Sequence, residues 1–178
     1  PTLFKGIEGM DVDIQTASGN ASITSDGYIL AGKGRVDILN ETATTTTFES
    51  TLQTEFIIPD DVVNNNLLIT AKVSHGIGAS TTKTAVLYTT ALIEETGETI
   101  SNTIRVQTNS QEKIVELIPL NALNGVKAGN KITVKVTRKA ATGDDNSDRN
   151  SVLLKSIKVK LNRASAPVSG TSNKFEIQ

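Results

Sequence analysis

The chain has 178 residues, of which 18 are Lys or Arg and 19 are Asp or Glu, so its formal net charge at pH 7 is -1. A chain of this length can form one domain with a hydrophobic core of its own, and its near-zero charge gives no long-range attraction to nucleic acid or anionic lipid. Because there is no cysteine, disulfides, thiolate metal sites and a thiol nucleophile are excluded.

The apolar residues are mostly aliphatic, since hydrophobic residues make up 37% of the chain and aromatic residues only 3%. Isoleucine, valine and threonine favour pleated sheets, so this composition predicts a β-rich fold. No apolar run approaches the roughly 20 residues that a membrane helix needs. The opening PTLFKGIEGMDV also lacks the charged-then-apolar layout of a signal peptide. We therefore expect a soluble protein made in the cytoplasm.

The first 50 residues show only weak patterning. In residues 1–25 apolar side chains are scattered between glycines and polar residues, which predicts a first strand or an arm lying on another subunit. Between Gly27 and Leu39 two short apolar runs flank the turn GKG and predict two short strands. The threonine-rich residues 40–50 favour extended backbone but bury little, so we interpret them as an edge strand or a linker.

Residues 51–163 are expected to form the main body. Apolar runs rich in β-branched residues are separated by turn signals, and they predict strands within 51–59, 67–76, 82–93, 99–109, 110–120, 131–138 and 152–161. No segment has the pattern of an amphipathic helix, apart from a single turn that 120–123 could form. We predict an all-β, antiparallel β-sandwich of the jelly-roll type with an extended N-terminal segment. A closed barrel is the alternative.

The clearest pattern runs from Lys131 to Leu161. In KITVKVT and SIKVKL apolar and polar residues alternate, so each segment is predicted to be a strand with a β-branched face on the core and its lysines in water. We expect the two strands to pair as an antiparallel hairpin around the polar loop 139–150. The remaining residues, 164–178, are small and polar up to Phe175, which predicts a flexible C-terminal tail ending in a short docking segment.

Candidate chemistry is sparse. Asp144, Asn146 and Asp148 alternate as in a calcium loop, but Arg149 and Lys155 stand where that loop needs a glycine and a glutamate, so we interpret the segment as a solvated contact loop. His75 is the single histidine and has no partner pattern for a triad or a metal site. The adjacent carboxylates at 60–61 and 94–95 point apart in a strand or turn, which disfavours a glycosidase pair. We therefore expect no enzyme, no cofactor and no metal.

Two surface features remain open. The lysines of the last strand, Lys155, Lys158 and Lys160, could meet an acidic partner, although such a face is commonly just solvated. Saccharide-binding β-sandwiches usually present aromatic platforms, and this chain has no Trp, two Tyr and four Phe. Saccharide binding would then depend on polar loops.

The order of the segments TLQTEFIIPDD, LLITAKV and AGNKITVKVTRKAATGDDNSDRNSVLLKSIKVKL resembles that of jelly-roll virion structural proteins of tailed bacteriophages. In these a strand ending in proline, alternating strands, a GN or GD turn, a strand with a terminal arginine, a loop and a last strand follow one another. The matching parts here are Phe56 to Pro59, Gly129-Asn130, Ile132 to Arg138 and Val152 to Leu161. The resemblance covers residues 51 to 163.

This resemblance implies a structural virion protein, made in the host cytoplasm. It would be a capsid decoration (cement) protein that binds and stabilises the phage head through multivalent surface contacts. The alternative is a fibre or receptor/glycan-binding module of a tail or head fibre, using the loops at 60–66, 76–82 and 139–150 on one end of the sandwich. A polysaccharide-cleaving enzyme is a more distant possibility.

The expected partners are other virion proteins, namely the major capsid protein or a fibre or adaptor protein, and a second and third copy in a homotrimer. No nucleic acid or membrane partner is expected. The N-terminal arm, the 139–150 loop and the tail are the predicted partner contacts, through Leu3, Phe4, Ile7, Met10, Asp144, Asp145, Asn146, Asp148, Arg149 and Phe175.

Overall fold

The structure is a computed structural model that describes residues 10–11, 16–19, 21–24, 27–30, 49–63, 67–75, 84–107, 111–120, 122–139 and 151–162. Every regular element in these ranges is a β-strand, and none of them contains a helix. The strands are β1 (Met10–Asp11), β2 (Thr16–Gly19), β3 (Ala21–Thr24), β4 (Gly27–Leu30), β5 (Glu49–Ile57), β6 (Leu68–His75), β7 (Thr84–Ile93), β8 (Thr99–Gln107), β9 (Lys113–Ile118), β10 (Lys131–Lys139) and β11 (Val152–Lys160).

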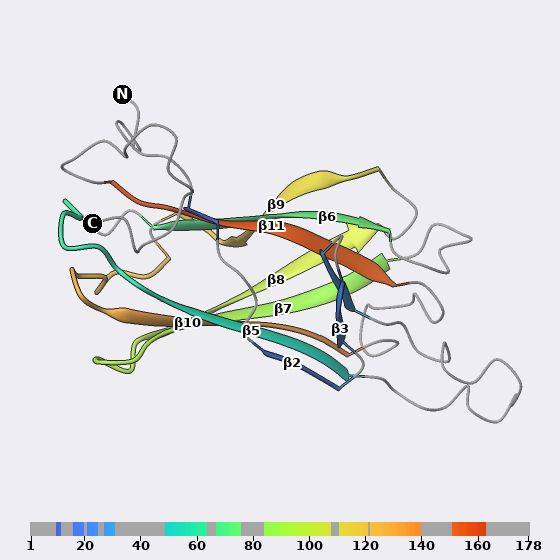
Figure 1. The fold of residues 1–178 in the computed structure, drawn as a ribbon, viewed down its shortest axis with the longest axis horizontal. Coiled ribbons are helices and arrows are strands. Elements are labelled where there is room, and N and C mark those ends of the chain that lie inside the picture. Colours follow the sequence, from blue (N-terminus) through green and yellow to red (C-terminus); the bar gives the residue numbers. More distant parts are fainter. Residues whose placement is uncertain are drawn as a thin grey trace, which may run out of the picture.

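The strands form two antiparallel sheets packed face to face (Figure 1). Sheet A has the order β3-β4-β11-β6-β9, with β1 also paired to β11, and sheet B has the order β2-β5-β10-β7-β8. From β4 to β11 the chain visits the sheets in the order A, B, A, B, B, A, B, A, which is the connectivity of a jelly roll. The predicted all-β jelly-roll sandwich is confirmed, and the described strands do not form the closed barrel that was its alternative.

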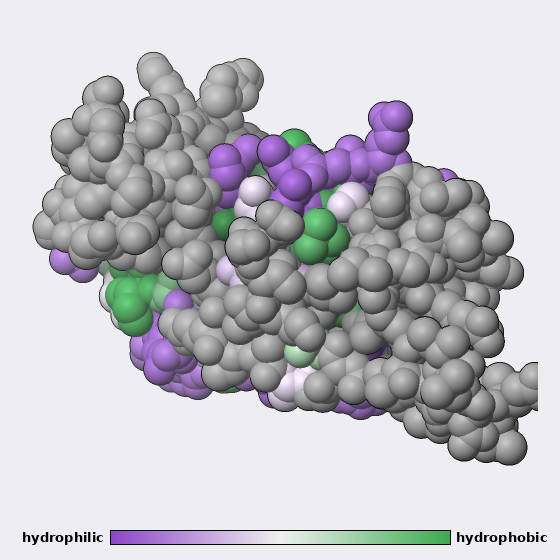
Figure 2. Space-filling view, turned by 45° about the vertical axis from the view of Figure 1, so that its right-hand side comes forward, coloured by the Kyte–Doolittle hydropathy of each residue, from purple (hydrophilic) through white to green (hydrophobic). Residues whose placement is uncertain are grey.

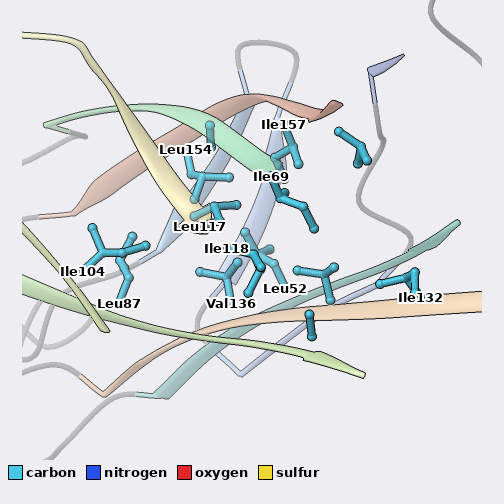
Figure 3. Packing of buried hydrophobic residues seen from close by; sticks show 14 of the residues in the cluster. Leu52, Ile69, Leu87, Ile104, Leu117, Ile118, Ile132, Val136, Leu154 and Ile157 are labelled. Atoms are coloured by element: carbon cyan, nitrogen blue, oxygen red, sulfur yellow. The ribbon is translucent and has the colours of Figure 1, made fainter. Parts of the chain in front are cut away.

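An aliphatic core lies between the two sheets (Figure 3). Sheet A contributes residues such as Ile69, Leu117 and Leu154, and sheet B contributes residues such as Leu52 and Val136 from the opposite side. Phe56 is the one aromatic residue among the buried members of this cluster in the part of the chain that the structure describes. The low aromatic content of the sequence therefore appears in the structure as a core of branched aliphatic side chains.

The predicted hairpin of the segments 131–138 and 152–161 is wrong in its pairing, although both strands exist. β10 lies in sheet B between β5 and β7, and β11 lies in sheet A between β4 and β6. The two strands therefore face each other across the core. Alternation predicts which side chains of a strand are buried, but it does not say which strand lies next to it, because two facing sheets and one hairpin need the same alternation.

A β-bulge explains why the buried apolar residues of β11 change from even to odd positions along the strand. Val152 and Leu154 are buried at even positions, whereas Ile157, Val159 and Leu161 are buried at odd positions. The pairing with β6 shifts between Lys155 and Lys158, so that one extra residue of β11 is accommodated there. Ser156, inside the bulge, has a φ of 53°, in the left-handed region. The bulge turns the second half of β11 back toward the core.

The strands before β5 belong to the two sheets. β1 and β4 pair with β11, β2 pairs with β5, and β3 pairs with β4, so the sheets include chain from both sides of the boundary expected at Thr51. Gly27 has a φ of 136°, and an added Cβ there would lie 2.8 Å from the carbonyl oxygen of Leu154. A side chain at Gly27 would push β4 away from β11. Residues 164–178, expected to form a tail, lie outside the described ranges.

One open side of the sandwich is closed by a side chain. The Asn102 amide nitrogen, on edge strand β8, donates to the carbonyl oxygens of Glu116 and Leu117 on edge strand β9, at 3.1 and 3.2 Å. The contact ties the edges of the two sheets together.

Arg138, the terminal arginine of the sequence pattern, is fully buried at the end of β10. Its guanidinium donates a hydrogen bond of 3.0 Å to the carbonyl oxygen of Leu30, so it links sheet B to β4 of sheet A through the interior. Burying a cation is costly unless its donors are satisfied, so this contact fixes where β4 lies against β10.

We predict that Arg138→Ala lowers the free energy of unfolding by about 3 kcal/mol, because it leaves a cavity and removes a buried donor. Lys135→Ala, on the exposed face of the same strand, is the control and should change it by less than about 0.5 kcal/mol. Urea denaturation of both variants measures the difference. Equal effects of the two substitutions would show that Arg138 does not hold the sheets together.

Candidate binding faces

Most of the predicted partner contacts lie outside the described residues. This holds for Leu3, Phe4, Ile7, Asp144, Asp145, Asn146, Asp148, Arg149 and Phe175, and their role stays a prediction. Met10 is described through its backbone, where β1 pairs it with Val159 of the same chain. The segment around Met10 thus adds a short strand to its own sheet A.

The three loops expected on one end of the sandwich divide between its two ends. Ile57, which leads into 60–66, pairs with Lys131 at the start of β10, whereas Lys139, which leads into 140–150, pairs with Glu49. These pairs lie at opposite ends of β10. His75, before 76–82, pairs with Val152, so that connection begins at the end where 140–150 is attached. A single receptor-binding end made of all three loops is therefore wrong.

The adjacent carboxylates Glu94 and Glu95, at the end of the sandwich where β10 starts, have structural partners. Glu95 accepts a hydrogen bond from the backbone N–H of Lys131, and Glu94 accepts one from the hydroxyl of Thr133. Glu98 accepts N–H bonds from Asn124 and Gly125 at 2.7 and 2.8 Å. These carboxylates hold the β7–β8 turn against the segment before β10. They do not converge as an acid/base pair.

A row of hydroxyl side chains crosses the outer face of sheet B. In register across its five strands stand Ser18, Thr51, Thr137, Tyr88 and Thr103. Directly opposed residues of antiparallel strands point to the same side, and at a strand spacing of about 4.8 Å the row spans about 19 Å. One neighbouring row on the same face consists of Thr16, Gln53, Lys135, Thr90 and Ser101, and the row on the other side includes Glu49, Lys139 and Arg105.

Tyr88 is the aromatic residue at the centre of this face, and 40% of its surface is exposed. In the sheet it stands between Thr137 of β10 and Thr103 of β8, which pair with it in register. The hydroxyls of Thr51 and Thr137 lie 3.4 Å apart, within hydrogen-bonding reach of each other. We call the row through Tyr88 and the row through Gln53 together the hydroxyl face. The sequence could not reveal it, because its residues come from five strands whose order was unknown.

The ion pairs of sheet B lie at the two ends of the hydroxyl face. Lys131 bonds to Glu55 at 3.0 Å at one end, and Lys139 lies 3.8 Å from Glu49 at the other. The hydrogen bond and the charge of Glu55 raise the pKa of Lys131, with smaller contributions from Glu94 and Glu95. The row through Tyr88 itself carries no charged side chain. The row through Tyr88 is therefore polar and neutral, and Lys135 is the charged residue of the adjacent row through Gln53.

The outer face of sheet A has a different character, with lysines on β6 and β11. Figure 2 shows hydrophilic residues gathered along the upper margin, the side on which sheet A lies in Figure 1, with small hydrophobic patches between them. A hollow of about 170 Å³ lies here, with Thr70, Lys72, Ile114, Ser156, Lys158 and Lys160 in its lining. We call it the bulge hollow, since Ser156 is the residue in the bulge.

Glu112 neutralises one side of the bulge hollow. Its carboxylate lies 2.7 Å from the ammonium of Lys155 and 4.0 Å from that of Lys72. The hydrogen bond from Lys155 lowers the pKa of Glu112, and the charges of Lys155 and Lys72 act in the same direction. Within the described residues Lys158 and Lys160 have no ion pair.

The described residues contain no group of three or more His, Asp or Glu placed to hold a metal ion. Nor do they contain a helix long and apolar enough to cross a membrane.

No family model matches the sequence, and no curated protein matches it significantly. Similar solved structures include a carbohydrate-binding module in complex with β-1,4-galactotriose, with 11% identity, 83% of this chain and 88% of that chain covered, and a TM-score of 0.44. A xylan-binding module has 12% identity, 94% and 96% coverage and a TM-score of 0.41.

The enzymatically active domain of tailspike protein 4 of bacteriophage CBA120 is also similar, at 6% identity and a TM-score of 0.43. That match covers 87% of this chain but only 19% of the tailspike chain. At these identities and TM-scores the likenesses assign no function to this chain. None of the three is a capsid decoration protein, so the expected cement role has no support from them. The expected trimer, virion partners and location stay predictions.

We predict that Tyr88→Ala changes the free energy of unfolding by less than about 1 kcal/mol, because a half-exposed cross-strand side chain contributes about 0.2–1 kcal/mol to a sheet. Leu87→Ala, the next residue of β7 and fully buried, should cost about 2–5 kcal/mol. Thermal or urea unfolding of both variants measures this. If Tyr88→Ala also lowered the free energy of unfolding by about 2 kcal/mol or more, the ring would be needed for the stability of the fold.

Proposed function

We propose that this chain is a non-catalytic saccharide-binding module whose binding surface is the hydroxyl face of sheet B. This is the second of the two roles that the sequence resemblance implies, a glycan-binding module, in place of capsid decoration. The observation that carries the proposal is the row of hydroxyl side chains with an exposed tyrosine at its centre, in register across five strands.

The side chains of the face match the chemistry of a sugar. A tyrosine ring offers an apolar surface with a polar tip, on which the apolar face of a pyranose can stack. Threonine and serine hydroxyls donate and accept, so they can pair with sugar hydroxyls of either polarity. Gln53 and Thr90, in the adjacent row, add further donors and acceptors beside the ring. The face thus offers one stacking position surrounded by hydrogen-bonding groups.

The charge distribution favours a neutral saccharide. The charged pairs Lys131–Glu55 and Lys139–Glu49 satisfy each other at the two ends of the face. Two exposed cations, Lys135 of β10 and Arg105 of β8, stand in the rows on either side of Tyr88. A neutral saccharide that lies along the row of Tyr88 would meet no charged side chain in that row, so its binding would need no charged partner there.

The binding is expected to be weak for a single module. The face is open and has one aromatic residue, so a dissociation constant on the order of 1 mM, about -4 kcal/mol, is the scale to expect. Several linked copies would bind a polymer much more tightly than one copy does. A repeating polysaccharide supplies such repeated sites, which fits a surface without reactive groups.

The test is a screen of neutral and acidic oligosaccharides against the wild-type chain, followed by titration calorimetry on the best neutral ligand. Tyr88→Ala should weaken binding about tenfold or more, equivalent to about 1.4 kcal/mol. Tyr88→Phe, which keeps the ring, should stay within about threefold of wild type, or about 0.7 kcal/mol.

Val63→Ala is the matched control, since it removes an exposed apolar side chain that lies outside the strands of both sheets' binding faces. Binding should be unchanged in this variant. The proposal is refuted if no neutral saccharide binds, or if Tyr88→Ala binds as tightly as wild type.

A further inference from the structure

We infer that the bulge hollow on sheet A is a second binding site, which takes the carboxylate or sulfate group of an acidic saccharide. This site lies on the opposite sheet from the hydroxyl face and does not depend on the function proposed for that face. Its occupant is defined by charge and by the shape of the hollow.

The bulge creates the hollow. Between the pairs Lys155–Lys72 and Lys158–Thr70, strand β11 has two residues where β6 has one, so the ladder is interrupted beside Ala71. Ser156 has the left-handed conformation, which is uncommon and unfavourable for a non-glycine residue. Outliers of this kind occur often at binding sites, and this one puts an exposed hydroxyl residue in the lining.

The lining is positively charged. Lys72, Lys158 and Lys160 all line the hollow, and Lys155 lies beside it, paired with Lys72 in register. Glu112 satisfies Lys155 and, at a longer distance, Lys72. Lys158 and Lys160 form no ion pair with any side chain that the structure describes, and Lys158 stands in register with Asp11 of β1. These two ammonium groups are the ones that we infer meet the anion. A hydrogen bond from an ammonium group to an oxygen anion is stronger than a hydrogen bond between two neutral groups.

The size and the apolar wall favour a sugar over an acidic peptide. A hollow of about 170 Å³ is smaller than the roughly 300–1,000 Å³ of a drug-sized pocket, so it fits one compact group. Ile114 is 69% exposed and supplies an apolar wall, while Thr70 adds a hydroxyl to the lining. The edge of sheet A beside the hollow is β9, and there Asn102 already bonds to the carbonyls of Glu116 and Leu117, which disfavours a peptide added as a strand at this edge.

The experiment titrates four probes into the full chain: an oligogalacturonate, a sulfated dextran oligosaccharide, the unmodified dextran oligosaccharide and a short poly-glutamate peptide. Calorimetry gives the affinity, and amide chemical shifts locate the site. The two acidic saccharides should bind and perturb amides of β6, β9 and β11. Their affinity should fall with added salt. Which of them binds more tightly distinguishes carboxylate from sulfate.

Four variants test the named groups. Lys158→Gln with Lys160→Gln should weaken the binding of acidic saccharides about tenfold or more. Lys127→Gln with Lys139→Gln, an equal change of net charge at exposed positions outside both faces, should change the affinity less than twofold. Glu112→Gln should strengthen binding several-fold, because it frees Lys155 and Lys72. Tyr88→Ala should have no effect, which separates this site from the hydroxyl face.

The inference is overturned if both double variants weaken binding equally, since the effect would then be net charge alone. It is also overturned if the neutral dextran binds as tightly as its sulfated form, or if poly-glutamate is preferred over both acidic saccharides.

Discussion

The two sheets of this protein are held together by aliphatic side chains that alternate with polar ones along each strand. Leu52 and Val136 from sheet B meet Ile69, Leu117 and Leu154 from sheet A, and the polar neighbours of these residues are left on the two outer faces. Where a strand alternates, placing its apolar residues in the core leaves the residues between them on a surface, and most of these are polar. The chemistry of the outer faces is a consequence of how the core is built.

This relation produces two unlike surfaces on one chain. On sheet B the outward positions carry serine, threonine and tyrosine in register, with ion pairs at the two ends. On sheet A they carry lysines, and a bulge in β11 opens a hollow among them. One face suits a neutral polyhydroxylated ligand and the other suits an anion. A module with both could bind a saccharide that has neutral and acidic units.

The sequence was sufficient to predict the strands and the fold class, but not which strands lie next to each other. The alternation of Ile132, Val134 and Val136 correctly predicted one buried face of β10. In β11 the apolar residues change from even to odd positions between Leu154 and Ile157, and this change marks the place of the bulge. Pairing is set by contacts between segments far apart in the chain, so the hairpin and the common end for three loops were wrong. The hydroxyl face was hidden for the same reason, since it needs the order β2-β5-β10-β7-β8.

The motifs that suggested virion proteins have structural roles in this fold. The N–H of Gly129 bonds to the carbonyl of Ile58, and the N–H of Ile58 bonds back to the carbonyl of Asn130, which ties the chain before Pro59 to the start of β10. Arg138 joins the sheets through the core. A jelly roll needs such connections whatever it binds, so these residues report the fold, and function has to be argued from the faces.

The most direct measurement of the central claim is a map of amide chemical shifts during titration with a neutral oligosaccharide that binds. The account predicts that the largest changes fall on β5, β10, β7 and β8 around Tyr88, with sheet A unaffected. Changes confined to sheet A or to the ends of the sandwich, with none around Tyr88, would contradict it.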